Sequence, residues 1–115
     1  MIIHSQTCIW DNYKELVIIS HKSKASCRIY IYNDEPNIAY ISNLYVDEKE
    51  RNKGIGTELL KYCIDKAKQL NCSKIQLRSD NEDFVRKWYF RLGFKLIKSE
   101  IWLEKDIDDF YKVLS

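Results

Sequence analysis

Glycine and proline are scarce in this sequence. Its 115 residues include only three glycines and one proline, where average usage would supply about eight glycines. Two of the three glycines, Gly54 and Gly56, stand one residue apart in the stretch RNKGIGTELL, directly before an apolar helical pattern. A chain that uses glycine so sparingly is expected to need these two for a specific local purpose.

Long apolar runs, a strong charge of one sign and clustered metal ligands are missing as well. No run of 18 or more apolar residues exists, so no membrane span is predicted, and the N-terminus MIIHSQTCIW lacks the form of a secretory signal. The net charge of +2 disfavours a dedicated nucleic-acid binder. The four cysteines form no C-x-x-C pair and only two histidines are present, so we expect reduced thiols, a cytoplasmic location and no metal site.

The residues that are present suit one globular domain over residues 1–115. The chain is 45% hydrophobic, which is enough for a core at this length. Strands are predicted over residues 15–20 and 26–33, as a hairpin, and over 37–46 after the turn NDEP. Residues 1–7 could add an edge strand. Because the strand at 37–46 has apolar residues on both faces, it should be central in the sheet.

Two amphipathic helices are predicted in the second half. From Thr57 to Asn71 apolar residues recur at three and four positions, at Leu59, Leu60, Cys63, Ile64, Ala67 and Leu70. A strand over 73–79 follows. Asp80, three residues before Asp83, gives a capping-box-like start to a second helix, which ends at Gly93, where positive φ is expected. Strands over 94–99 and 101–107 close the chain. This order predicts a mixed α/β fold of the α+β kind around one sheet.

The two glycines lie where a loop becomes a helix, and such a place binds anions. The first helical turn has unpaired N–H groups and a partial positive charge, and glycine lets an anion approach the backbone closely. Arg51 and Lys53 add charge, as Lys49 could. The P-loop pattern is absent because no lysine follows either glycine, and the Rossmann pattern fails because Leu59 occupies its third glycine position.

The loop resembles the pyrophosphate loop of the GNAT superfamily of acyl-CoA-dependent N-acyltransferases. Its pattern R/Q-x-x-G-x-G/A is met by Arg51-Asn52-Lys53-Gly54-Ile55-Gly56, inside a strand–loop–helix–strand stretch that is similar over its full length. A second family motif is matched by Trp88 and Tyr89 followed by Gly93-Phe94. All three glycines thus fall at family positions, and the resemblance covers about residues 26–107.

The resemblance implies a fold, a co-substrate and a set of site residues. The fold would be a mostly antiparallel sheet with a central pair of parallel strands that splay apart, and two main helices. The co-substrate would be acetyl-CoA, without a metal, and a primary amine would attack its thioester directly. The pantetheine arm would pair with Leu44, Tyr45 and Val46, and an N–H near Val46 would hold the oxyanion. The pyrophosphate would bind the amides of Asn52, Lys53, Gly54, Ile55, Gly56 and Thr57, and Tyr89 would protonate the leaving thiolate.

The sequence also departs from the family. No carboxylate lies on the strand at 37–46 to act as general base, and Asp80 and Glu82 are the nearby alternatives, although each suits a helix cap better. Asn81 stands one position away from the asparagine of many relatives, so its contact to the cofactor is doubtful. Family members commonly have two helices near the N-terminus, and too few residues remain for them here, while the connection near 98–100 is short.

Three functions stay open at this stage. The first is an N-acetyltransferase with an open acceptor site, which suits a protein lysine or N-terminus or a small amine; a homodimer could supply the missing wall. The second is a non-catalytic acyl-CoA-binding domain. The third, a small nucleic-acid-binding module, is disfavoured because the sheet is predicted to be apolar on both sides.

Overall fold

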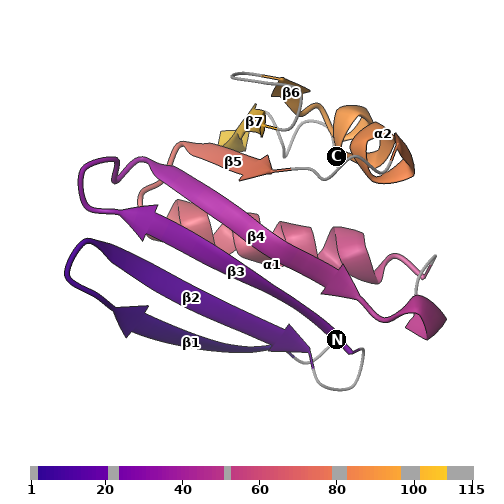
Figure 1. The fold of residues 1–115 in the computed structure, drawn as a ribbon, viewed down its shortest axis with the longest axis horizontal. Coiled ribbons are helices and arrows are strands. Elements are labelled where there is room, and N and C mark those ends of the chain that lie inside the picture. The colour runs from indigo at the N-terminus through magenta and orange to yellow at the C-terminus, as the bar shows by residue number, and fades with distance from the viewer. Residues whose placement is uncertain (1–2, 21–23, 51–52, 79–82, 97–101, 109–115) are drawn as a thin grey trace.

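The described part of the chain folds as one mixed sheet against which the helices α1 and α2 lie (Figure 1). The computed structural model describes residues 3–20, 24–50, 53–78, 83–96 and 102–108. Within these residues the sheet has seven strands in the order β1-β2-β3-β4-β5-β7-β6. The elements are β1 (His4–Ile9), β2 (Tyr13–Ser20), β3 (Ala25–Tyr32), β4 (Ile38–Val46), the 3-10 helix η1 (Glu48–Glu50), α1 (Ile55–Gln69), β5 (Lys74–Arg78), α2 (Asp83–Arg91), β6 (Lys95–Leu96) and β7 (Trp102–Asp106).

The first four strands form an antiparallel meander. The predicted hairpin is confirmed as β2 and β3, the predicted edge strand as β1, and the predicted central strand as β4. The turn between β1 and β2 is tight, because Trp10 N–H donates to the Tyr13 carbonyl at 2.9 Å. The described chain therefore runs from β1 into β2 without the two helices that family members commonly have there.

Helix α1 crosses the back of the meander in Figure 1 and covers the inner face of the sheet. It begins at Ile55, two residues before the predicted start, and its apolar face is the predicted one. Asn71 ends it with φ 67°, a conformation that asparagine tolerates. The core consists of this face and the inward side chains of the strands, among which the largest fully buried ones are Ile18, Ile29, Leu59, Leu60, Ile64, Ile75, Leu77 and Leu103.

A bulge in β4 precedes the place where the sheet opens. Ser26 of β3 pairs with Tyr45 of β4, whereas Arg28 pairs with Ser42. Two residues of β4, at positions 43 and 44, therefore lie opposite the single Cys27. An extra residue of this kind bends its strand and interrupts the ladder of hydrogen bonds.

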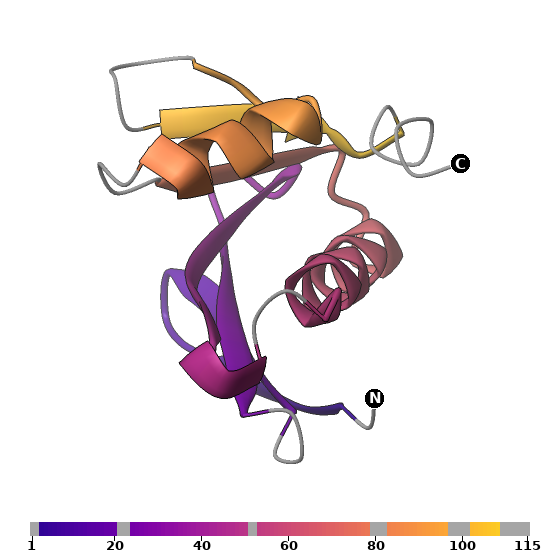
Figure 2. The same cartoon turned by 90° about the vertical axis from the view of Figure 1, so that its right-hand side faces the viewer.

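Strands β4 and β5 are parallel neighbours for only part of their length. Their pairs run from Ile38 with Lys74 to Ile41 with Leu77, and no described pair follows. Among the described residues, the pairs of Ser42, Tyr45 and Val46 are with β3 and none is with β5. Figure 2 shows β4 diverging from the part of the sheet that holds β5 and β7. The splayed parallel pair implied by the resemblance is confirmed.

Helix α2 lies beside the half of the sheet that contains β5, β6 and β7 (Figure 2). It ends as predicted before Gly93, which has φ +90°. The chain then turns back, since Phe94 N–H donates to the Tyr89 carbonyl at 3.1 Å. The short connection predicted near residues 98–100 lies outside the described residues.

The outer face of the meander is not apolar, so the prediction that both faces are apolar is wrong. It carries a row of aromatic rings, and the centroid of each ring lies within 6.2 Å of the centroid of another. These rings belong to Trp10, Tyr13, Tyr30, Tyr32 and Tyr40. Beside them Arg28 pairs with Glu15 at 3.6 Å. Charges of both signs accompany the rings, so the face does not have the basic character that RNA binding requires.

Gly93 provides a test of the α2–β6 turn. Replacing it with alanine should lower the free energy of unfolding by about 1–2 kcal/mol, because φ +90° strains any residue with a Cβ. The contact of the new Cβ with the Lys105 ammonium should add little, since that side chain is flexible. Urea denaturation measures the loss. Gly93→Asn should cost less than Gly93→Ala, and equal stability of wild type and Gly93→Ala would contradict this account of the turn.

Candidate functional site

The first turn of α1 presents backbone N–H groups that no described side chain caps. Gly54 is the N-cap residue, with φ 79°, and no side-chain hydrogen bond is made to the helix start. A Cβ added at Gly54 would have no atom within 4 Å, so the space over the loop is open. Uncapped amides at the positive end of a helix dipole form an anion site. The predicted residues Gly54, Ile55, Gly56 and Thr57 therefore lie together at this helix start.

Gly56 lies where three elements meet. A Cβ there would lie 3.7 Å from the Trp88 ring of α2 and 3.8 Å from Val46 at the end of β4. Both distances are ordinary van der Waals contacts, so packing within the protein does not demand glycine at this position. The need for a bare backbone is explained better by a ligand that comes close to it.

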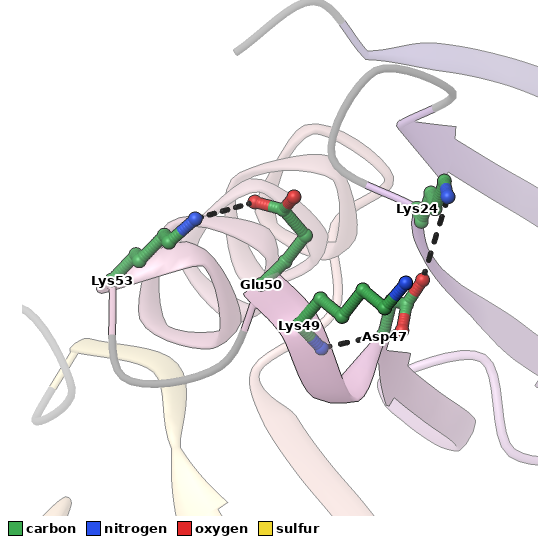
Figure 3. Close-up of polar contacts among 5 residues, drawn as sticks. All are labelled: Lys24, Asp47, Lys49, Glu50 and Lys53. Carbon is green, nitrogen blue, oxygen red and sulfur yellow. Dashed lines mark hydrogen bonds and ion pairs between the residues drawn. The ribbon is translucent and has the colours of Figure 1, made fainter.

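Two ion pairs lie near the loop (Figure 3). The Lys53 ammonium is 3.2 Å from the Glu50 carboxylate, and the Lys24 ammonium is 3.8 Å from that of Asp47. The Lys49 backbone N–H donates to Asp47 at 3.3 Å. Lys53 is thus near the helix start as predicted, but its charge is shared with Glu50. Lys53 would therefore add less attraction for an anion than an unshared charge would.

The end of β4 supplies the second part of the site. Leu44, Tyr45 and Val46 all lie in the stretch of β4 that has left β5. The side chains of Leu44 and Val46 pack against the core, whereas Tyr45 is exposed on the outer face. Because this stretch has no described β5 partner, an extended ligand could pair with its backbone on that side.

Tyr89 of α2 is buried next to Trp88, whose ring lies beside Gly56. It is 6% exposed, with its ring 4.9 Å from that of Trp88 and 5.4 Å from that of Phe94. Burial raises the pKa of its phenol well above the usual value near 10, and the nearby Cys27 and Cys63 thiols raise it further. Tyr89 therefore stays protonated at neutral pH and can donate a hydrogen bond.

The two thiols beside Tyr89, those of Cys27 and Cys63, lie on the inner side of the sheet. A contact with Cys27 and then burial raise the pKa of Cys63 well above its usual range. Cys27 lies opposite the β4 bulge, and Cys63 faces it from α1. A sulfur placed in these surroundings is disfavoured as a thiolate.

Several predicted site residues cannot be placed. Arg51 and Asn52 of the loop, and Asp80, Asn81 and Glu82 before α2, lie outside the described residues. Among the described residues no group of three histidine, cysteine or carboxylate side chains could hold a metal ion. None of the described helices is long and apolar enough to cross a membrane.

One polar group near the opening was missed by sequence reasoning. Gln76 of β5 is buried, and its side-chain N–H donates to Glu104 of β7 at 2.8 Å. Lys74 lies 3.6 Å from the other oxygen of Glu104. The stretch SKIQLRS alternates polar and apolar residues, which indicated a strand but not that one polar member would be enclosed.

Comparisons with known proteins agree with this geometry. The family model described as the acetyltransferase (GNAT) family matches residues 11–94. No curated protein matches the chain at a significant level.

Solved structures that resemble the chain include three bacterial and archaeal proteins. An acetyltransferase of the GNAT family from Staphylococcus aureus superposes with a TM-score of 0.67 at 19% identity, covering 83% of this chain and 68% of that one. The PaiA N-acetyltransferase of Thermoplasma acidophilum in complex with coenzyme A superposes with a TM-score of 0.67 at 20% identity, and the match covers 83% of this chain and 61% of that one. A Bacillus anthracis protein in complex with acetyl coenzyme A superposes with a TM-score of 0.63 at 23% identity, and the match covers 84% of this chain and 64% of that one. At these identities the likeness shows the fold.

Burial of Tyr89 predicts sensitivity to alkali. Above pH 10 the phenol ionises in the unfolded chain but keeps its proton in the folded one, so the folded state binds more protons and stability falls as pH rises. Its contribution is constant below pH 10 and declines by up to about 1.4 kcal/mol per pH unit above it. Urea denaturation between pH 9 and 12 should show a shallower decline in Tyr89→Phe than in wild type.

A second variant tests whether the effect is specific. Burial, followed by the hydrogen bond to Glu35, raises the pKa of Tyr40 to about 12, so Tyr40→Phe should remove a further part of the same decline. Equal slopes in wild type and Tyr89→Phe would contradict the buried phenol.

Proposed function

This chain belongs to the GNAT acetyltransferase family, and we propose that it transfers the acetyl group of acetyl-CoA to a primary amine by direct attack. The observation that carries the proposal is the junction of three elements at Gly56. There the uncapped amides of α1 adjoin the end of β4, which has no described β5 partner, and Trp88, the residue before Tyr89 in α2, lies beside Gly56. An anion site next to a strand segment without a described β5 partner suits a ligand that has a diphosphate at one end and an amide-containing arm.

The start of α1 would hold the pyrophosphate. The amides of Gly54, Ile55, Gly56 and Thr57 would donate to it, assisted by Asn52, and Arg51 and Lys53 would add charge. Because Lys53 already pairs with Glu50, its contribution should be small. Open space at Gly54 and tolerance for a Cβ at Gly56 support a ligand of this kind at the loop.

The end of β4 would bind the arm and the reacting carbonyl. Backbone groups of Leu44, Tyr45 and Val46 would pair with the arm as a neighbouring strand would. An N–H near Val46 would stabilise the oxyanion that forms during attack. One such preorganised donor is worth about 3–4 kcal/mol in other acyl transfers. Holding both substrates in attack geometry would supply much of the remaining acceleration.

Tyr89 would protonate the departing thiolate. Burial raises the pKa of the phenol, which by itself weakens the acid. A thiolate formed in the same apolar surroundings is also destabilised, as the raised pKa of Cys63 indicates. The two shifts oppose each other, so proton transfer is feasible when it accompanies the breaking of the carbon–sulfur bond.

The acceptor must lose a proton before it attacks. At pH 7 roughly one lysine amine in 2,500 is neutral, against roughly one α-amine in seven. No carboxylate lies on β4, so the general base stays unassigned. The absence of helices between β1 and β2 favours an open acceptor site and a bulky or exposed amine.

The alternative is a non-catalytic domain that binds acyl-CoA. The lack of a carboxylate on β4 and the direct β1–β2 connection favour it. Titration with acetyl-CoA tests the binding that both functions share. Release of free thiol with a panel of amines separates them, because only the acetyltransferase releases thiol in proportion to acetylated amine.

Substitutions at Gly56 test CoA binding independently of folding. Gly56→Ala should fold with equal or higher stability, by up to about 1 kcal/mol, because alanine favours helix and its Cβ makes ordinary contacts. Its affinity for CoA should nonetheless fall, and Gly56→Asp should abolish binding through crowding and charge repulsion. Calorimetric titration with CoA measures the affinity of both variants.

Gln69→Asp is the matched control, since it adds the same charge at the far end of α1 and should keep wild-type affinity. Unchanged affinity in Gly56→Asp would contradict the anion site.

Tyr89→Phe tests the proton donor. The variant keeps the buried ring and should bind acetyl-CoA with wild-type affinity, while turnover falls about 10²–10⁴-fold, the usual contribution of a general acid. Thiol release under saturating substrates measures turnover. Wild-type turnover in Tyr89→Phe would remove the residue from the mechanism.

A further inference from the structure

The two edge strands of the described sheet differ in how well they are protected against pairing with another chain. At one edge β6 has only two residues, Lys95–Leu96. At the other edge β1 has six, HSQTCI, which include no lysine, arginine, acidic residue or proline. Its pairing with β2 runs from His4 to Ile9 without a register shift. Proteins protect sheet edges with short strands, lysines, prolines and bulges. Strand β6 has the first two of these features, whereas β1 has none.

Every second residue of β1 directs its backbone groups away from the sheet. In an antiparallel pair, alternate residues turn both their N–H and their C=O toward the same neighbouring strand. Trp10 N–H donates to the Tyr13 carbonyl at 2.9 Å, in the register that places Ile9 opposite Lys14. Residues 4, 6 and 8 therefore also turn toward β2. The residues whose backbone groups point to the side on which no described strand lies are Ile3, Ser5, Thr7 and Ile9.

The side chains of β1 alternate between the two faces of the sheet. Ser5 lies opposite Ile18, which is buried in the core, so the odd-numbered side chains lie on the inner side and the even-numbered ones on the outer side. At one end of this inner row Ile9 is 77% exposed. At the other end Ile3 lines an open depression together with Glu58, Lys61, Tyr62 and Asp65 of α1.

A second copy of β1 matches this edge in one antiparallel register. With Gln6 opposite the partner's Gln6, Ile3 lies opposite the partner's Ile9 and Ser5 opposite the partner's Thr7. Every residue that points its backbone groups outward then meets another such residue, and opposed side chains lie on the same face. A shift by one residue would oppose side chains of different faces. A shift by two would leave one outward-pointing residue of each chain unmatched.

We propose that β1 is a docking edge for a second copy of this chain, whose own β1 pairs with it antiparallel about a two-fold axis at Gln6. The two sheets then form one continuous sheet. Ile9 of each copy lies beside Ile3 of the other, at the depression next to α1. The dimer does not depend on acetyl transfer. Because β2 and β3 lie between β1 and β4, the partner stays away from the parting of β4 and β5 and supplies no wall for the acceptor site.

Contact along one short strand predicts reversible association. The six residues of β1 span about 20 Å, and an interface of this length is at the small, transient end of the size range. Sedimentation velocity between about 5 and 500 µM protein should show mostly monomer at the lowest concentration and a growing share of dimer above it. A monomer throughout this range overturns the proposal, even if the edge binds an extended segment of a different protein.

Thr7→Pro tests the backbone contact. Proline removes an N–H that points away from β2, so pairing within the chain is kept while two hydrogen bonds between the copies are lost. The dissociation constant of the dimer should rise at least about tenfold. Thr7→Val is the matched control, because it keeps the N–H and the β-branched shape and should associate as wild type. Equal association of wild type and Thr7→Pro, with circular dichroism showing both folded, overturns the β1 interface.

Gln6→Cys tests the register and does not require the proline variant to fold. Residues directly opposite in a pair without mutual hydrogen bonds have Cα atoms about 4.5 Å apart, which a disulfide can span. With Cys8→Ser as background, Gln6→Cys should give a cross-linked dimer on a non-reducing gel after mild oxidation with diamide.

The matched controls for this cross-link are Ser5→Cys and Thr7→Cys in the same background. Each of these positions lies about 7–8 Å from its own copy, as a diagonal neighbour, and should cross-link far less. Cross-linking that is absent at position 6, or stronger at position 5 or 7, overturns the proposed pairing.

Discussion

The separation of β4 from β5 is the constraint on which the rest of the site depends. A strand in the middle of a sheet needs partners on both sides, because unpaired backbone groups away from water are costly. From Ser42 onward β4 has one described partner, β3. The bulge opposite Cys27 bends the strand at the position where pairing with β5 ends, so the two features belong to one deformation. A sheet continuous over its whole length would leave no place for a ligand between these strands.

Backbone groups, more than charged side chains, define the proposed site. Asp47 pairs with Lys24 and Glu50 pairs with Lys53, so these two lysines share their charge with carboxylates of the protein. What distinguishes the start of α1 is the uncapped first turn and the left-handed Gly54. Gly54 and Gly93 have the positive φ that glycine tolerates best, and Gly56 lies where the proposed ligand would approach the backbone.

How far the sequence predicts this structure depends on the kind of feature. The apolar periodicity of α1, the strands up to Asp106 and the turn at Gly93 were predictable because each depends on neighbours close in sequence. The parting of β4 and β5 was implied only by the family resemblance, since a bulge arises from pairing between distant residues. The burial of Gln76 was not predictable at all, because a polar residue in an alternating strand is normally exposed. The polar outer face was missed because tyrosines count as apolar in a pattern but remain half-exposed here.

The direct connection from β1 to β2 changes what the outer face can do. Two helices at that place would cover part of the sheet, and here a tight turn at Trp10 replaces them. The rings from Trp10 to Tyr40 then remain at the surface beside the parting of the strands. If the amine enters from this side, the rest of its molecule meets flat aromatic surface and no enclosing wall. Selectivity would then depend on the few side chains beside the parting of β4 and β5, because no wall of helices adds contacts.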